Sequence, residues 1–319
     1  MIGSRLEHIL RSGHLAVTGE IGGPRSADGR AITASARAQV GCIDAVNVGD
    51  NAVARAEMSP VAGSALVVDA GLEPIMQLTT RDRNRLALTS DLLGGWALGA
   101  RNLLCLGGDP MSSGEEPGTT EVRDLSVPEL VHIAVRLREE ARLPSGAEIE
   151  SPPRYFVGVV DEPLIADYDI RHLEAKLDAG ADFVQTQIAY DLEGVVEWAD
   201  AVRPHGVFER ASILVGVAPL RSLRMARWMN DHLPGVTVPE HLLGNLERAG
   251  EDEGSVGIQL TVDLIGQLRR IPGVAGIHLM CLGREETVGR VAEAAGLLPR
   301  PAVPEIATVP PGSGRGEQP

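Results

Sequence analysis

The sequence predicts a single (β/α)8 barrel, the TIM-barrel fold, and three observations lead to this prediction. The chain has 319 residues and is 44% hydrophobic, which is enough apolar material for one large core. Short apolar runs alternate with longer amphipathic stretches, a pattern typical of parallel strands that are buried on both faces and separated by helices. Eight such units favour a closed barrel over an open sheet, because α/β barrels commonly form one domain of about 250 residues.

The predicted strands are short apolar runs that recur along the whole chain. They cover residues 14–20, 43–48, 73–78, 102–106, 155–160, 183–187, 213–217 and 276–281. Between them, apolar residues recur at helical spacing, as expected for helices that cover a barrel. The predicted helices cover residues 82–98, 127–141, 169–179, 192–202, 223–232, 256–268 and 287–297.

Residues 1–300 are expected to form this barrel as one domain. Residues 301–319 are rich in Pro and Gly and contain no aromatic residue, so we expect a disordered tail. Residues 110–124 are a long loop after the fourth strand, on the face where barrels build active sites. A Rossmann domain is disfavoured, because no GxGxxG motif stands between a strand and a helix.

Composition excludes several other classes of protein. The net charge is −15 and no stripe of basic residues is present, so a nucleic-acid partner is not expected. No apolar stretch reaches about 18 residues, and residues 1–12 contain no apolar signal segment, so we expect no membrane association and a cytoplasmic protein. Cys42, Cys105 and Cys281 are widely separated, which favours buried thiols over a disulfide framework or a metal site.

Polar residues at the ends of the predicted strands are the candidates for chemistry, because barrel active sites lie at that rim. Asp50 is expected to cap a helix. The chain contains no Ser–His–Asp arrangement, no HExxH and no phosphate-binding loop motif. A rim rich in carboxylates and amides but poor in nucleophiles favours an enzyme whose cofactor carries the difficult chemistry. The polar rim residues are Glu20, Asn47, Asp50, Gln77, Thr79, Asp109, Asp161, Glu162, Gln185, Gln187 and His278.

Several motifs resemble the methylenetetrahydrofolate reductase family, and they occur in family order from Glu20 to about Leu297. They are QLTTRDRNR at 77–85, LGGWALGARNLLCLGGDP at 93–110, KLDAGADFVQTQ at 176–187, GVAPLRSLRMARWM at 216–229 and GIHLMCLG at 276–283. The sequence departs from better-known members at two positions. Gln77 stands where they have His, and Leu223 stands where they have a Phe that stacks on the substrate.

The resemblance implies a flavin-containing barrel, with FAD as the flavin and FMN as the alternative. Hydride passes from NAD(P)H, or electrons from a partner protein, to the flavin and then to methylenetetrahydrofolate, giving methyltetrahydrofolate; the reverse direction is also open. A homo-oligomer or a partner subunit is compatible with this. Two other readings stay open: a flavin-independent, pterin-binding methyltransferase-like barrel, and a non-catalytic subunit of a larger redox complex.

The resemblance also assigns roles to the rim residues. Glu20 matches the catalytic glutamate, which delivers a proton to a folate nitrogen from a carboxyl with a raised pKa. Asp109 matches an aspartate beside the flavin and the pterin, and is expected to act in catalysis and in binding both. Gly107 and Gly108 have no side chains, so the cofactor can approach the backbone closely.

The remaining assignments concern binding. Gln187 is expected to hydrogen-bond the folate and the nicotinamide, and Leu223 to contact the substrate, whereas we expect Gln185 to face the other way and to be structural. Lys176, the only lysine in the chain, and Asp169 match positions that contact the phosphate and ribityl or ribose groups of the flavin. Three lower-ranked members of the flavin or folate shell are Asn47, Gln77 and Thr79. Arg81, Asp82, Arg83 and Arg85 are expected to serve in capping and ion pairing.

Overall fold

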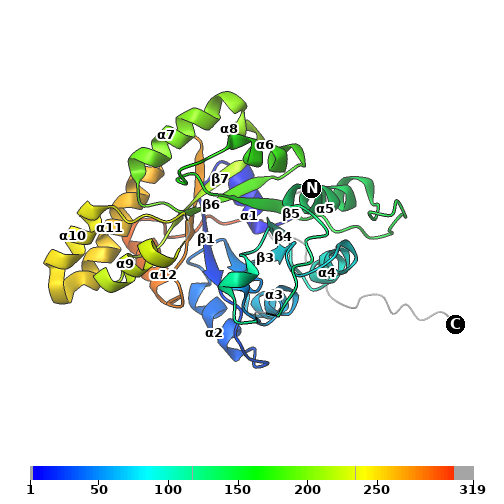
Figure 1. Cartoon of the computed structure of the whole chain (residues 1–319), viewed down its shortest axis with the longest axis horizontal. Helices are drawn as coiled ribbons and strands as arrows, with labels where there is room; N and C mark the ends of the chain where they lie inside the picture. Colours follow the sequence, from blue (N-terminus) through cyan, green and yellow to red (C-terminus); the bar gives the residue numbers. More distant parts are fainter. Residues whose placement is uncertain (1–2, 117, 234, 305–319) are drawn as a thin grey trace.

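A computed structural model of the chain describes residues 3–116, 118–233 and 235–304. In these residues, eight parallel strands pair in sequential order and close into a barrel, as predicted. Figure 1 shows the strands in the middle of the molecule with helices around them. The strands are β1 (Ala16–Ile21), β2 (Ala45–Val48), β3 (Pro74–Thr79), β4 (Asn102–Leu106), β5 (Phe156–Asp161), β6 (Phe183–Ile188), β7 (Ser212–Val217) and β8 (Val274–Leu279).

All the predicted helices are present, with small shifts at their ends. They are α4 (Arg85–Ala97), α5 (Val127–Glu140), α6 (Ile170–Asp178), α7 (Leu192–Val202), α9 (Leu223–His232), α11 (Glu253–Leu268) and α12 (Thr287–Ala294). The capping box of α5, formed by Ser126 and Glu129, shows why that helix begins where the long loop ends.

Five further α-helices in the described residues were not predicted. They are α1 (Arg5–Arg11), α2 (Arg30–Gln39), α3 (Pro60–Asp69), α8 (Val207–Arg210) and α10 (Glu240–Ala249). Helix α3 has apolar residues on all sides, so it has no clear helical period in its sequence. Helices α2 and α10 are amphipathic, and their period could have been recognised.

The barrel interior is apolar at its amino-terminal end. Side chains from seven strands meet there, and Leu6, Ile9 and Leu10 of α1 pack against them. The rings of Phe156 and Phe183 stack with their centroids 5.1 Å apart. Helix α1 therefore closes this end of the barrel, opposite to the face where the predicted site lies. The strand residues are Ala16, Ala45, Ile75, Leu104, Phe156, Phe183 and Leu214.

Two carboxylates, one buried and one half-buried, hold α1 in place. Glu73, just before β3, accepts the backbone N–H groups of Arg5 at 2.6 Å and Leu6 at 3.0 Å, which satisfies two free donors of the first helical turn. Asp44, just before β2, accepts from Arg5 at 3.0 Å and also pairs with Arg300. The carbonyl of Pro301 accepts from Arg5 at 2.8 Å. The expected tail lies mostly outside the described residues, which end at 304.

Candidate active site at the carboxyl ends of the strands

Glu20 lies near the end of β1, half-buried inside the barrel mouth, which we define as the face at the carboxyl ends of the strands. Burial raises the pKa of its carboxyl, and the nearby carboxylates of Glu57 and Glu285 raise it further, whereas a hydrogen bond with Gln77 on β3 lowers it. Together these effects raise the pKa of Glu20 above its ordinary value. Glu20 is therefore a carboxyl that holds its proton at a higher pH than a free glutamate, as a proton donor must.

A layer of hydrogen-bonded polar side chains fills the barrel below Glu20. The Asn47 amide donates to Gln185 at 2.7 Å, and the Gln185 amide donates to Thr18 at 3.3 Å. Thr18 is in turn 3.0 Å from Nδ1 of His278. Burial lowers the pKa of His278 to about 3, so its imidazole is neutral at neutral pH. This inner polar layer supports the mouth from beneath.

Two expectations change because of this layer. Gln185 is structural, but it faces the barrel interior, so the expectation that it faces away from the site was wrong; residues two apart in a strand share a face. Asn47 lies inside the same layer with its amide bonded to Gln185, below the rim where a cofactor shell was expected.

Asp50 does not cap a helix, contrary to expectation. Its buried carboxylate accepts the backbone N–H of Thr79 at 2.7 Å and the Thr79 hydroxyl at 3.0 Å, and it pairs with Arg83. The N-cap of α3 is instead Ser59. Asp50 thus ties the end of β2 to the end of β3. Thr79 uses both of its donors in this contact.

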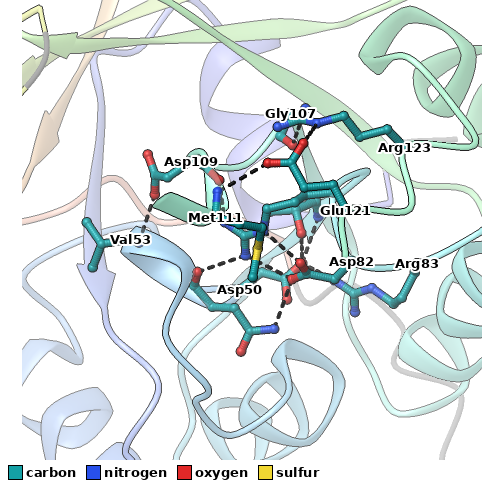
Figure 2. A network of polar contacts seen from close by, with 12 residues as sticks. Asp50, Val53, Asp82, Arg83, Gly107, Asp109, Met111, Glu121 and Arg123 are labelled. Carbon is teal, nitrogen blue, oxygen red and sulfur yellow. Dashed lines mark hydrogen bonds and ion pairs between the residues drawn. The ribbon is translucent and has the colours of Figure 1, made fainter. Parts of the chain in front are cut away.

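The chain leaves β4 through Gly107, Gly108 and Asp109 at the mouth, and Figure 2 labels the first and the last of them. One carboxylate oxygen of Asp109 accepts the backbone N–H of Val53 at 2.7 Å, and its carbonyl accepts from Arg81 at 3.0 Å. Gly108 has φ of +81°, and a Cβ there would lie 3.0 Å from the Arg81 side chain. Glycine is therefore required at 108 by both conformation and space.

The long loop after β4 is held by its own polar contacts, which Figure 2 also draws. Glu121 accepts the backbone N–H of Met111 at 3.1 Å and pairs with Arg123. Arg123 donates to the carbonyl of Gly107 at 3.3 Å. The loop therefore folds back on the end of β4. As expected, these arginines form ion pairs: Arg81 with Asp82, Arg83 with Asp50 and Asp91, and Arg85 with Asp124.

Lys176 and Asp169 both belong to the α6 segment, but their settings differ. The Lys176 ammonium is half-buried and donates to the carbonyl of Val160 at 2.7 Å, and burial lowers its pKa. Asp169 is the N-cap of α6, where it accepts from the backbone N–H of Arg171 at 3.0 Å. Its contact with the Arg171 guanidinium lowers the Asp169 pKa to about 2.

Gln187 and Leu223 stand on the other side of the mouth. Gln187 is half-buried near the end of β6, and its side-chain oxygen accepts the backbone N–H of Ile188 at 2.9 Å. Leu223 is the first residue of α9, and its backbone N–H donates to Glu253 at 2.8 Å. Its partly buried side chain packs against the hydrophobic core between the barrel and the helices, so this part of the rim is apolar.

Glu57 and Glu285 were not singled out in the sequence, yet both act on Glu20 through their charge. Each lies in a loop after a strand, and no local motif marks such positions.

No group of His, Cys, Asp and Glu suited to a metal ion occurs in the described part of the chain. Within the same residues, no helix has the length and apolar character needed to cross a membrane.

The sequence profile of the methylenetetrahydrofolate reductase family matches residues 5–296. The chain belongs to this family. It is 27% identical over 269 residues to methylenetetrahydrofolate reductase 1 of Schizosaccharomyces pombe, a match that covers 79% of the chain and 40% of that relative. The chain therefore spans well under half of the yeast protein.

A bacterial relative is closer in length. The 5,10-methylenetetrahydrofolate reductase of Salmonella typhimurium is 25% identical over 233 residues, covering 72% of each protein. Among solved structures, an uncharacterized Clostridium thermocellum protein that binds two copies of 5-methyltetrahydrofolic acid superposes with a TM-score of 0.60 at 12% identity. That match covers 92% of this chain and 99% of the other, and it confirms the fold.

Proposed function

We propose that this member of the family catalyses flavin-dependent reduction of 5,10-methylenetetrahydrofolate to 5-methyltetrahydrofolate, or the reverse reaction. The observation that carries the proposal is the setting of Glu20: a single carboxyl at the end of β1, half-buried in the mouth, with a raised pKa. Methylenetetrahydrofolate must receive a proton on a ring nitrogen before its bridge opens, and such a carboxyl supplies it.

Gln77 orients this proton donor. Its hydrogen bond with Glu20 fixes the direction of the carboxyl, and it comes from β3, which is separated from β1 by only one strand. The inner polar layer beneath is hydrogen-bonded between Asn47, Gln185 and Thr18, so the floor of the mouth is preorganised. Glu20 is thus held at a fixed position for a bound pterin ring.

The ends of β4 and β5 fit a flavin. Gly107 and Gly108 carry no side chain, so a flat ring could approach the backbone closely at the end of β4. The Asp109 carboxylate keeps one oxygen beyond its bond to Val53, and the Lys176 ammonium keeps N–H groups beyond its bond to Val160. When bound, the flavin supplies the hydride-transfer chemistry. We propose FAD, with FMN as the alternative, and NAD(P)H or a partner protein as electron donor.

The proposed positions of the pterin near Glu20 and of the flavin at the ends of β4 and β5 imply roles for the other rim residues. We propose that Asp109 faces the pterin and the flavin edge, where its negative charge favours a cationic folate intermediate. Gln187 and Leu223 would bound the substrate on the opposite side of the mouth. Asn47, Thr79 and Asp169 already have protein partners, so any contribution from them to cofactor binding is through the shape of the site. The cytoplasmic location and the oligomeric state stay predictions.

The Glu20→Gln variant tests the proposal. A glutamine keeps the size and a hydrogen bond to Gln77 but carries no transferable proton, so we expect reduction of methylenetetrahydrofolate by the reduced flavin to slow by about 100-fold or more. Reduction of the flavin by NAD(P)H should stay within about threefold of the wild-type rate, because hydride transfer to the flavin needs no proton from Glu20. Rapid-mixing spectroscopy of each half-reaction measures both rates. Equal losses in the two half-reactions would contradict the assignment.

A further inference from the structure

A turn with an unusual backbone conformation follows β2 at the barrel mouth. In this turn Asn51, Val53 and Ala54 have φ of +51°, +48° and +54°. Left-handed backbone is uncommon for residues other than glycine, and for a β-branched residue such as Val53 it is a genuine outlier. Such backbone persists only where surrounding contacts hold it, and it gathers at functional sites. The contacts of residues 51–54, which we call the left-handed turn, therefore indicate what the turn serves.

The main anchor of the left-handed turn is Arg81, whose side chain is only 1% exposed. Its guanidinium forms two bonds with the Asp82 carboxylate, at 2.6 and 2.8 Å. It also donates to the carbonyl oxygens of Asn51 and Asp109, at 3.0 Å each. Arg81 follows β3, which lies between β2 and β4 in the barrel. It therefore joins the turn after β2 to the segment after β4, a task that suits the fixed fork of donors in a guanidinium.

Two further sets of contacts fix the left-handed turn. The Asn51 amide donates to Asp82 at 3.1 Å, and its oxygen accepts the backbone N–H of Glu57 at 3.0 Å. On the side of the long loop after β4, Gly114 packs directly on Ala54, so that a Cβ at Gly114 would clash with the Ala54 carbonyl. The turn is thus held from both sides.

The left-handed turn presents the backbone N–H of Val53 to Asp109. This N–H donates to one carboxylate oxygen of Asp109 at 2.7 Å, a contact that Figure 2 draws. A bond from a backbone N–H to a carboxylate is charge-assisted and therefore strong. The carbonyl of the same residue is bonded to Arg81, so one network fixes both the backbone and the side chain of Asp109.

We propose that Arg81 is a positioning residue for the reaction: acting through the left-handed turn, it holds the Asp109 carboxylate in one orientation toward the pterin. The inference rests on the proposed function, because it needs Asp109 to face the bound folate. A side chain that is free to rotate must be ordered when a ligand binds, and this ordering weakens binding. A carboxylate fixed beforehand avoids that loss. In this role Arg81 acts on the folate only through Asp109.

A double-mutant cycle of Arg81→Gln and Asp109→Ala tests the inference. The readout is the affinity of the full-length protein for methyltetrahydrofolate, measured by calorimetric titration without turnover. We expect Arg81→Gln to weaken binding about tenfold when Asp109 is present, and less than about twofold together with Asp109→Ala, because no carboxylate is then left to orient. A purely structural role of Arg81 would give the same loss in both backgrounds.

Two other variants complete the experiment. Arg85→Gln is the matched control, since it removes the same charge four residues further along, where Arg85 pairs with Asp124. It should change the affinity by less than about twofold in both backgrounds, as expected for an exposed ion pair. If Arg81→Gln does not fold, Asn51→Gly replaces it, because glycine adopts left-handed backbone freely and both side-chain contacts of Asn51 are lost. Its expected loss is about threefold, again only when Asp109 is present.

Equal losses with and without Asp109 would overturn the inference and leave the proposed function intact. Wild-type affinity in both Arg81→Gln and Asn51→Gly would do the same, as would an Arg85→Gln variant that loses as much affinity as Arg81→Gln. Unchanged affinity in Asp109→Ala alone would contradict the proposed role of Asp109, and the inference with it. A wild type that binds no methyltetrahydrofolate would contradict the proposed function itself.

Discussion

At the scale of single residues, the site depends on how the surroundings of each carboxyl set its proton affinity. Glu20 and Asp169 are both acidic side chains near the rim, yet burial raises the pKa of Glu20 and the Arg171 contact lowers the pKa of Asp169 to about 2. At neutral pH, Asp169 is therefore a fixed anion, whereas Glu20 is the carboxyl that can exchange a proton. This difference separates a capping residue from a catalytic one.

The raised pKa of Glu20 predicts a pH dependence. Reduction of methylenetetrahydrofolate needs the protonated carboxyl, so its rate should be constant at low pH and fall about tenfold per pH unit once the pH exceeds the raised pKa. Flavin reduction by NAD(P)H should not share this descending limb. Single-turnover rates of both half-reactions between pH 5 and 9 measure the two profiles. A folate half-reaction that keeps its full rate across this range would exclude Glu20 as the proton donor.

The same burial predicts an effect on stability. Because the folded-state pKa of Glu20 is raised, the carboxyl favours folding fully below its ordinary pKa of 4.5, and this contribution is lost as the pH rises through the folded-state value. Glu20→Gln removes a charge that is poorly solvated and repelled by Glu57. The variant should therefore melt at a higher temperature than the wild type at pH 8, with a smaller difference near pH 4. Calorimetric melting at both pH values checks this, and a lower melting temperature of the variant at pH 8 would contradict it.

At the scale of elements, the two ends of the barrel differ in kind. The amino-terminal end is apolar and closed by α1, whereas the carboxyl end carries the polar layer and the rim. The contacts of Glu73 with the first turn of α1 and with the Asn102 amide at 2.8 Å fix the closing helix to the barrel. Closure at one end leaves the other as the only mouth of the described barrel interior.

Removing the Glu73 carboxylate tests this element. Glu73→Ala would leave two backbone donors of α1 without their acceptor and the Asn102 amide with only the Pro74 carbonyl, and we expect a loss of about 2 kcal/mol in the free energy of unfolding. Urea unfolding measures it. Glu139→Ala is the control, because its ion pair with Arg138 is exposed and worth about 0.5 kcal/mol at most. Equal losses in the two variants would show that Glu73 does not hold α1.

Much of the element order could be predicted from the sequence, and the failures have physical causes. Parallel strands were predictable because their continuous apolar runs are short and regularly spaced. The all-apolar helix α3 was not, since it lacks a period. At the site, the roles of Glu20 and Asp109 were predicted from the resemblance to the family. The partnership of Asp50 with Thr79 and the charge of Glu57 near Glu20 join residues from different βα units, so only the closed barrel reveals them.

At the scale of the whole molecule, the barrel separates stability from chemistry. Asp44 joins Arg5 of α1 to Arg300, so the two ends of the described chain meet on the face opposite to Glu20. The mouth is built instead from the loops, which carry Asp109, Glu57 and Glu285. Variation in these loops can change the choice of substrate or electron donor without disturbing the opposite face.

The most direct test of the central claim is the visible spectrum of the purified protein under anaerobic conditions, followed by separate additions of methyltetrahydrofolate and NAD(P)H. The account predicts a bound flavin whose absorbance is bleached by methyltetrahydrofolate, and also by NAD(P)H if the nicotinamide is the donor. Bleaching by the folate alone would identify a partner protein as the donor. A colourless protein that takes up no added flavin and shows no turnover would contradict the account and favour a flavin-independent pterin-binding barrel. Bound flavin that neither compound bleaches would instead indicate a non-catalytic subunit.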